Sequence, residues 1–258
     1  MMNALPRRLP IETVVKRSYL YAWESRAVLL TPLLIYAAIT AFADLALTRT
    51  VGTGDHLAVF LLTAVEQIFA MALQVGLHRY VLLGETPGGF QFFRWDRHFI
   101  QYALVTLLLF TIGLSAGLMI LGMAGDPTAQ PPTLGGAAIL FSIAVMLFVA
   151  LVLSRLALSL PAAALGDQVR GRRIWQATEG NGFRLLGATL LTILPLLVIE
   201  AALVSQMTSG GNNIGDFVIT VLLRMVASVQ LIVMTIMLSL SYDVLVRGGG
   251  PPARQPNP

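Results

Sequence analysis

Six apolar runs dominate this sequence, and each is longer than the roughly 18–20 residues that an α-helix needs to cross the hydrocarbon core of a bilayer. Because lipid offers backbone N–H and C=O groups no hydrogen-bond partner, such runs must be helices that satisfy these groups internally. The runs are 27–48, 57–83, 99–122, 136–164, 184–206 and 216–246. We therefore predict an all-α polytopic membrane protein in which six transmembrane helices form three hairpins.

The composition supports lipid as the main solvent. Only 12% of the 258 residues are charged and 56% are hydrophobic, whereas soluble domains carry about 25% charged residues. The six runs occupy most of the length, which leaves no room for a separate soluble catalytic domain. We predict a cytoplasmic or interfacial amphipathic segment at 1–26, a transmembrane domain at 27–246 and a disordered cytoplasmic tail at 247–258.

Basic residues gather in alternate connections between the runs. The first, third and fifth connections hold only Arg49. The others hold Arg7, Arg8, Lys16, Arg17 and Arg26 before the first run, Arg79, Arg94 and Arg97 at the second connection, Arg170, Arg172, Arg173 and Arg184 at the fourth, and Arg247 and Arg254 after the last run. Since Lys and Arg concentrate on the cytoplasmic side, we predict that both termini are cytoplasmic in a bacterial inner membrane.

The first 26 residues have an amphipathic pattern. One side of a helical wheel collects Ile11, Val14, Val15, Tyr19 and Ala22. This pattern predicts a helix lying in the membrane interface, with Trp23 at the level of the headgroups. A targeting signal cleaved after Ala41-Phe42-Ala43 is the alternative, but the charged lead-in is long and the apolar run continues beyond the usual length.

An internal repeat is a further hypothesis. An amphipathic or basic lead-in precedes an out-and-back hairpin three times, beginning near residues 10, 88 and 167. Pro32-Leu33-Leu34-Ile35 in the first hairpin matches Pro195-Leu196-Leu197-Val198 in the third. Parallel repeats occur in transporters and also as plain building units, so the repeat does not select a function.

Three ionisable residues lie well inside the apolar runs. At 1.5 Å per residue, Glu66 lies roughly 13 Å from the outer end of its run, Arg224 roughly 12 Å and Glu200 roughly 9 Å. We expect them to share one outer layer, with Asp44 nearer to the interface. Charges in hydrocarbon cost several kcal/mol, so this layer is either an interhelical ion pair or a polar-solute, ion or proton site with one carboxylate to spare.

The inner ends of the runs carry candidate lipid contacts. Arg79 and Arg155 lie near the inner ends of the second and fourth runs, where arginine side chains reach lipid phosphate. Arg155 has two further alternatives, an ion pair with Asp243 or a headgroup bound in a groove. The basic segment that follows adds Arg172, Arg173 and Trp175 to this predicted set.

No catalytic or metal-binding motif is found. The chain has no cysteine, and His56, His78 and His98 have no metal-ligand spacing. No GxSxG, Walker or HExxH sequence occurs. We therefore predict no enzymatic activity, no catalytic residue, no metal and no cofactor. The arginines flank apolar runs, which favours anionic lipid over nucleic acid as their partner.

The segment 154–186 carries the most specific local pattern. It consists of SRLALSLP at 154–161, Trp175, Thr178, Gly180-Asn181-Gly182 and Arg184-Leu185-Leu186. This pattern resembles the bacterial six-span proteins of the glycerophosphoryl diester phosphodiesterase membrane-domain and YciC-like families. Some members carry a phosphodiesterase domain, for which this chain has no room. The resemblance therefore implies an inner-membrane location and an accessory role, without hydrolase activity.

Two functions follow as hypotheses. The first is a non-enzymatic scaffold or accessory protein that binds anionic lipid, another membrane protein or a second copy of itself. The second is a small transporter or channel that uses Glu66, Glu200 and Arg224. A water-filled cavity at that layer would favour transport, whereas close packing would favour the scaffold.

Overall fold

The computed structural model describes residues 8–51, 56–86, 89–123, 136–167, 171–207 and 214–248, and every regular element in these ranges is helical. The elements are α1 (Ile11–Glu24), α2 (Arg26–Val51), α3 (His56–Leu83), η1 (Gly89–Phe92), α4 (Arg97–Met123), α5 (Gly136–Leu156), α6 (Ser159–Leu165), α7 (Gly171–Ala177), α8 (Gly182–Val204), α9 (Ile214–Tyr242) and η2 (Asp243–Arg247). Six helices are long and apolar enough to cross a membrane, which confirms the predicted fold class. The predicted tail from 249 onward lies outside the described residues.

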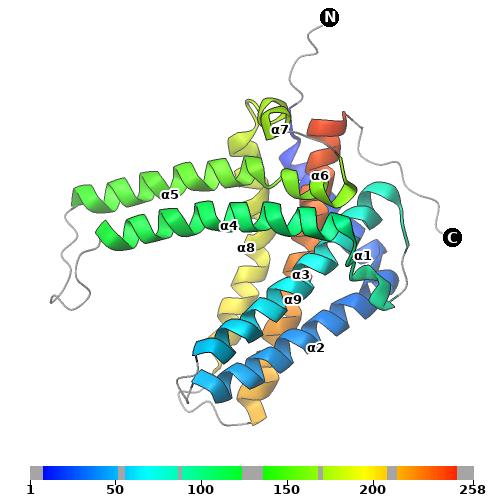
Figure 1. Ribbon diagram of the computed structural model, residues 1–258, viewed down its shortest axis with the longest axis vertical. Coiled ribbons are helices and arrows are strands. Elements are labelled where there is room, and N and C mark those ends of the chain that lie inside the picture. Colours follow the sequence, from blue (N-terminus) through cyan, green and yellow to red (C-terminus); the bar gives the residue numbers. More distant parts are fainter. Residues whose placement is uncertain are drawn as a thin grey trace, which may run out of the picture.

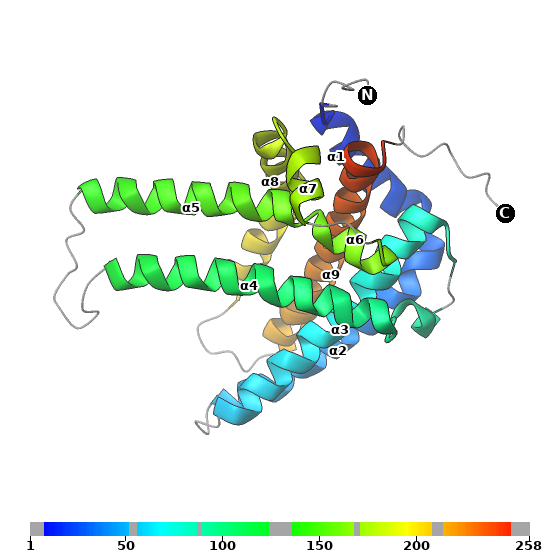
Figure 2. The same cartoon turned by 45° about the horizontal axis from the view of Figure 1, so that its top comes forward.

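The long helices form three hairpins, α2–α3, α4–α5 and α8–α9 (Figure 1). One end of every hairpin lies near α1, α6 and α7, and we call this end the base. The opposite ends, here called the tips, spread apart, and α4–α5 runs across the direction of α8 and α9 in both views (Figure 2). Alternating base and tip along the chain is the connectivity that six membrane crossings require.

Burial is concentrated toward the base. The buried residues of α3 begin at Ala70, and those of α8 end at Leu196. The same core contains Val14 of α1, Ile174 of α7 and Ile236 of α9. In contrast, Tyr102 is the only buried residue in the part of α4 whose side chains are described. The base therefore packs like a protein interior, whereas the hairpin tips expose apolar side chains, as expected for lipid-facing helices.

The amphipathic segment at the N-terminus is helical, as its pattern predicts, and it docks on the bundle. α1 packs against α8 and α9, with Val14 and Ser18 buried in the contact. Trp23, near the end of α1, remains exposed, and Arg26 lies over its ring at 4.8 Å. One face of α1 is therefore covered by protein, and only its outer side and Trp23 are available to the membrane interface.

The fourth run is broken near its base end. Helix α5 stops at Leu156, a two-residue turn follows, and α6 continues as far as Leu165. Pro161 lacks an N–H group and its ring conflicts with the carbonyl four residues earlier, so the single helix expected over 136–164 cannot continue unchanged. Residues 162–164 are buried against α3 and α4 after this break.

Gly166 ends α6 in a left-handed conformation, with φ at 71°, and lies beside the ring of His98. A Cβ at Gly166 would lie 2.7 Å from His98 Nδ1. We expect Gly166→Ala to lower the free energy of unfolding by about 1–3 kcal/mol, because backbone strain and a steric conflict act together. Thermal unfolding in detergent measures the loss. Adding His98→Ala should restore part of it, and a Gly166→Ala protein as stable as the wild type would contradict this account.

The connection after α3 folds back along that helix. The backbone N–H of Arg94 donates to the carbonyl of Ala72 at 3.2 Å, and the carbonyl of Phe92 lies directly against Gly76. Phe92 and Phe93 are buried, whereas Phe90 and Trp95 are exposed. Of these aromatic side chains, only Phe90 and Trp95 are therefore available to lipid, because the close approach at Gly76 places Phe92 and Phe93 in the core.

Candidate functional site

Three hairpin helices bring charged side chains together toward the tips. Arg224 of α9 donates through Nε and one terminal nitrogen to the two carboxylate oxygens of Asp44 on α2. Its other terminal nitrogen donates to Glu66 of α3 at 3.2 Å. The side chains of Arg224, Asp44 and Glu66 are 29%, 18% and 13% exposed. We call this cluster the Arg224 triad.

The Arg224 triad agrees with only part of the predicted layer. Glu66 and Arg224 are paired, but Asp44 occupies the place expected for Glu200. Within the described residues Glu200 has no ion pair, and its side chain is half-buried on α8. Asp44 was expected near the interface because the first apolar run was ended at residue 48. The helix continues to Val51, which places Asp44 roughly 10 Å inside its tip end.

The triad contains two carboxylates and one guanidinium. A bidentate bond, as formed with Asp44, is stronger than a single hydrogen bond between a guanidinium and a carboxylate. Glu66 accepts a single hydrogen bond from the terminal nitrogen that Asp44 does not use. Ion pairing offsets the cost of placing these charges in a poorly solvated position. The triad fixes the positions of α2, α3 and α9 relative to one another. It contains one more carboxylate than guanidinium groups. In the described part of the chain, no group of three His, Cys, Asp or Glu side chains could hold a metal.

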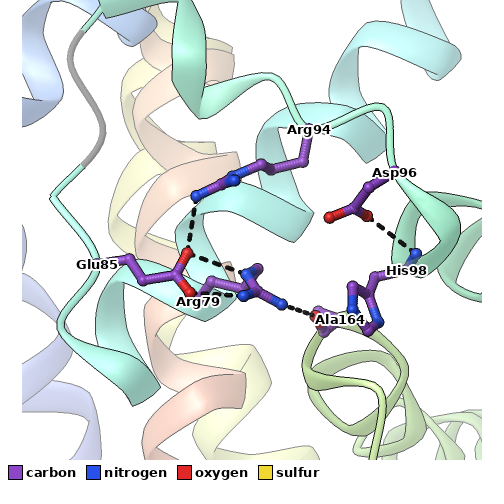
Figure 3. A network of polar contacts seen from close by, with 6 residues as sticks. All are labelled: Arg79, Glu85, Arg94, Asp96, His98 and Ala164. Carbon is purple, nitrogen blue, oxygen red and sulfur yellow. Dashed lines mark hydrogen bonds and ion pairs between the residues drawn. The ribbon is translucent and has the colours of Figure 1, made fainter.

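A second charged network lies at the base and is centred on Glu85 (Figure 3). Glu85 accepts hydrogen bonds from Arg79 at 2.5 and 3.0 Å and from Arg94 at 2.7 Å. Arg79 also donates to the carbonyl of Ala164 in α6 at 3.4 Å. Asp96 accepts the backbone N–H of His98 and thereby caps α4. Arg79, which was expected to contact lipid phosphate, is directed instead to a carboxylate of its own chain.

The pKa of Glu85 is lowered, chiefly by the hydrogen bond from Arg79 and further by the charges of Arg79 and Arg94. A lowered carboxylate pKa contributes stability above its unfolded value, and this stability is lost as the pH falls through the folded pKa. We expect Glu85→Gln to lower the free energy of unfolding by about 1–2 kcal/mol at neutral pH, given partial solvent exposure. The difference in the free energy of unfolding between wild type and Glu85→Gln should disappear at acid pH, where Glu85 is protonated.

Thermal unfolding measured across a pH series tests this expectation. Glu12→Gln provides the matched control, because Glu12 is exposed on α1 and the same charge is removed there. Equal stability of wild type and Glu85→Gln at neutral pH would show that the network does not hold the base together.

Arg155 lies at the end of α5 and contacts the segment 171–181. Its Nε donates to Thr178 Oγ1 at 2.9 Å, and a terminal nitrogen donates to the carbonyl of Trp175 at 2.6 Å. The guanidinium lies over the Trp175 ring, 3.6 Å from its centroid. The alternative pairing with Asp243 is not formed. Arg155 therefore fixes α7 against α5 through a cation–π contact and two hydrogen bonds.

Helix α7 presents the other predicted residues outward. Arg172, Arg173 and Trp175 are exposed, while Ile174 between them is buried. Within the described residues, neither arginine forms an ion pair. The buried Ile174 anchors the short helix, so its two charges and the indole face away from the core. This is the part of the predicted lipid-contact set that the structure leaves accessible.

The Gly180-Asn181-Gly182 turn has a role that the sequence pattern did not reveal. Gly180 has a φ of 71°, which suits glycine, and the turn separates α7 from α8. Asn181 Oδ1 accepts the backbone N–H of Leu9 at 2.9 Å, and Arg184 donates to the carbonyl of Leu9 at 2.9 Å. The turn therefore binds the chain just before α1, a contact between segments too distant in sequence for local patterns to predict.

Six helices of this length and apolar composition indicate a multi-pass integral membrane protein. Comparison with protein-family models, curated protein sequences and solved structures found no match.

Proposed function

We propose that this protein is a non-enzymatic accessory or scaffold protein of the bacterial inner membrane, and that its base binds anionic phospholipid headgroups. The observation that carries the proposal is the exposure of Arg172, Arg173 and Trp175 on α7, at the end of the molecule where the hairpins converge (Figure 1). Indole rings favour the level of the headgroups, and arginine forms bidentate bonds with phosphate. The resemblance of residues 154–186 to bacterial six-span membrane-domain families is consistent with an inner-membrane location.

Arg155 adds a further donor beside this surface. A guanidinium has five N–H groups, and its bonds to Thr178 and Trp175 use two of them. The Trp175 ring holds the group in a fixed position. A phosphate oxygen close to Trp175 could therefore accept hydrogen bonds from Arg155 as well as from the α7 arginines.

The proposal places the base in the cytoplasm. The basic connections of the sequence all belong to the base, and the tips hold Arg49 alone. In a bacterial inner membrane this charge asymmetry favours a cytoplasmic base. Anionic lipid attracts such residues by about 1 kcal/mol each, so Arg172 and Arg173 together contribute about 2 kcal/mol, or about 30-fold in binding.

Fluorescence quenching by brominated lipid tests the proposal at the site itself. A variant with Trp23→Phe and Trp95→Phe retains Trp175 as the single indole. In bilayers that mix zwitterionic and anionic lipid, we expect brominated phosphatidylglycerol to quench Trp175 more than brominated phosphatidylcholine. Arg172→Gln with Arg173→Gln should reduce this preference by up to about 30-fold, and added salt should reduce it too.

Two controls make the result specific. A second single-indole protein retains Trp23, which is also exposed near the base and should be unaffected by the α7 substitutions. Arg49→Gln removes a charge at the tips. Equal quenching of Trp175 by the two lipids, or a preference that survives loss of both α7 arginines, would contradict the proposal.

A small transporter or channel is the second candidate, and the excess carboxylate of the Arg224 triad is the observation that favours it. With Asp44 paired in a bidentate bond, Glu66 is the group that can gain or lose a proton or cation. Flux in proteoliposomes distinguishes the candidates. Glu66→Gln should abolish transport without loss of folding, whereas Glu200→Gln should leave it unchanged. Absence of flux through the wild type for protons, monovalent cations and small polar solutes would exclude this function.

A further inference from the structure

A buried histidine lies between three helices in the core at the base. His78 of α3 is fully buried, and its Nδ1 lies 2.7 Å from Ser239 Oγ of α9. The ring of Tyr102 from α4 lies beside it, with the two ring centroids 5.7 Å apart. Tyr102 is only 1% exposed. None of these groups takes part in the proposed lipid contacts.

The hydrogen bonds of Ser239 favour one tautomer of His78. The Ser239 hydroxyl donates to the carbonyl of Thr235 at 2.8 Å, and a carbonyl can only accept. A hydroxyl has one hydrogen, so while Ser239 donates it to Thr235, the hydrogen in the contact with His78 comes from Nδ1. This arrangement corresponds to the neutral Nδ1–H tautomer of His78, in which Nε2 presents a lone pair. In this tautomer the imidazole does not withdraw the serine proton.

Nε2 of His78 and two side-chain oxygens of α4 are buried polar atoms without a hydrogen-bond partner among the described residues. The oxygens are the Tyr102 hydroxyl and Thr106 Oγ1, one helical turn apart on α4. An unpaired buried acceptor or donor costs about 1–3 kcal/mol, and native proteins rarely leave such groups unsatisfied. The lone pair on Nε2 can accept a hydrogen bond, and the O–H of Tyr102 can donate one. A molecule that both donates and accepts hydrogen bonds could therefore satisfy both groups.

We propose that this contact between α3, α4 and α9 is a binding site for an internal water molecule, which donates to His78 Nε2 and accepts from the Tyr102 hydroxyl. Water is the smallest molecule with both capacities, and buried water commonly bridges polar groups of this kind. The neighbouring side chains of α6, Ala163 and Ala164, are small. Tyr102 is also the buried anchor of α4, so the water would link the α4–α5 hairpin to the core.

Nitrogen NMR of the full-length protein in bilayers tests this site. The chain has three histidines, so His56→Gln and His98→Gln leave His78 as the only imidazole. In this protein, His78 should show a protonated Nδ1. The chemical shift of its Nε2 should lie between that of an unprotonated nitrogen without a hydrogen bond and that of a protonated nitrogen. A water-edited spectrum should show transfer from water to this ring. Tyr102→Phe, which keeps the ring and deletes the hydroxyl, should weaken the transfer.

Three results would overturn the proposal. A protonated Nε2 would contradict the tautomer. A bare Nε2 signal would mean that nothing donates to it. An Nε2 shift that disappears in Tyr102→Phe, without any transfer from water in the wild type, would mean that tyrosine donates directly. Failure of the lipid-quenching experiment would leave this test unaffected, because His78 and Tyr102 lie inside the core.

Discussion

Replacing Arg224 by Gln is expected to lower the free energy of unfolding by about 3–5 kcal/mol, because it leaves Asp44 and Glu66 together without a positive partner in a poorly solvated position. Both carboxylates lose a charged donor, and their mutual repulsion is no longer offset. The three residues come from different helices, so the loss should separate α2 and α3 from α9. Thermal unfolding in detergent, followed by circular dichroism, measures the effect.

Neutralising the partners separates charge from packing. Combining Arg224→Gln with Asp44→Asn and Glu66→Gln removes the unpaired charges and should restore most of the stability, since a neutral polar cluster costs much less than a broken ion pair. Glu200→Gln is the matched control and should change stability by less than about 0.5 kcal/mol. A mild loss in Arg224→Gln alone, similar to that control, would mean that the triad does not hold the three helices in register.

The second large effect is expected at Gly76. A Cβ at this position would collide with the carbonyl oxygen of Phe92 and would lie 2.9 Å from the Phe92 carbonyl carbon. Both partners are backbone, so no side-chain rotation relieves the conflict. Gly76→Ala should therefore displace the segment around Phe92 from α3 and lower the free energy of unfolding by about 3 kcal/mol.

Gly117→Ala is the matched control for Gly76→Ala. Gly117 also lies within a long helix, but nothing is found within 4 Å of a Cβ placed there. Since alanine favours a helix over glycine by up to about 1 kcal/mol, Gly117→Ala should leave the unfolding midpoint unchanged or raise it. If both variants behaved alike, the close approach of Phe92 to α3 would not exist in the protein.

Hydropathy and charge predicted the helices and their connectivity. The helical content, the three hairpins and the interruption at Gly180-Asn181-Gly182 follow from apolar length and from glycine, all of which are local properties. The pairing of Glu66 with Arg224 was also predictable, because a buried charge needs an opposite one. Cytoplasmic orientation and lipid binding remain predictions.

Contacts between distant segments could not be read from the sequence. The sequence pattern assigns Arg79 to lipid, because it does not show that Glu85, just after α3, turns back beside this arginine. The bidentate pairing of Asp44 with Arg224 has no sequence signal, because the sequence does not show which helices are neighbours. The proline that accompanies the break in the fourth run, Pro161, can be read from the sequence. The length of the apolar run nevertheless favours one continuous helix, whereas the structure has two. The sequence tests His78 only as a metal ligand, through its spacing from other histidines. No sequence pattern indicates that it is buried beside Tyr102.

The sidedness of the three hairpins is the claim on which the account rests, and cysteine labelling tests it most directly. The chain contains no cysteine, so single cysteines can be placed at the tips, as His56→Cys and Gln206→Cys, and at the base, as Glu12→Cys and Gln176→Cys. All four positions are exposed. A membrane-impermeant maleimide added to intact spheroplasts should label both tip cysteines and neither base cysteine until the membrane is opened. Labelling of Gln206→Cys and Gln176→Cys from the same side would contradict the account.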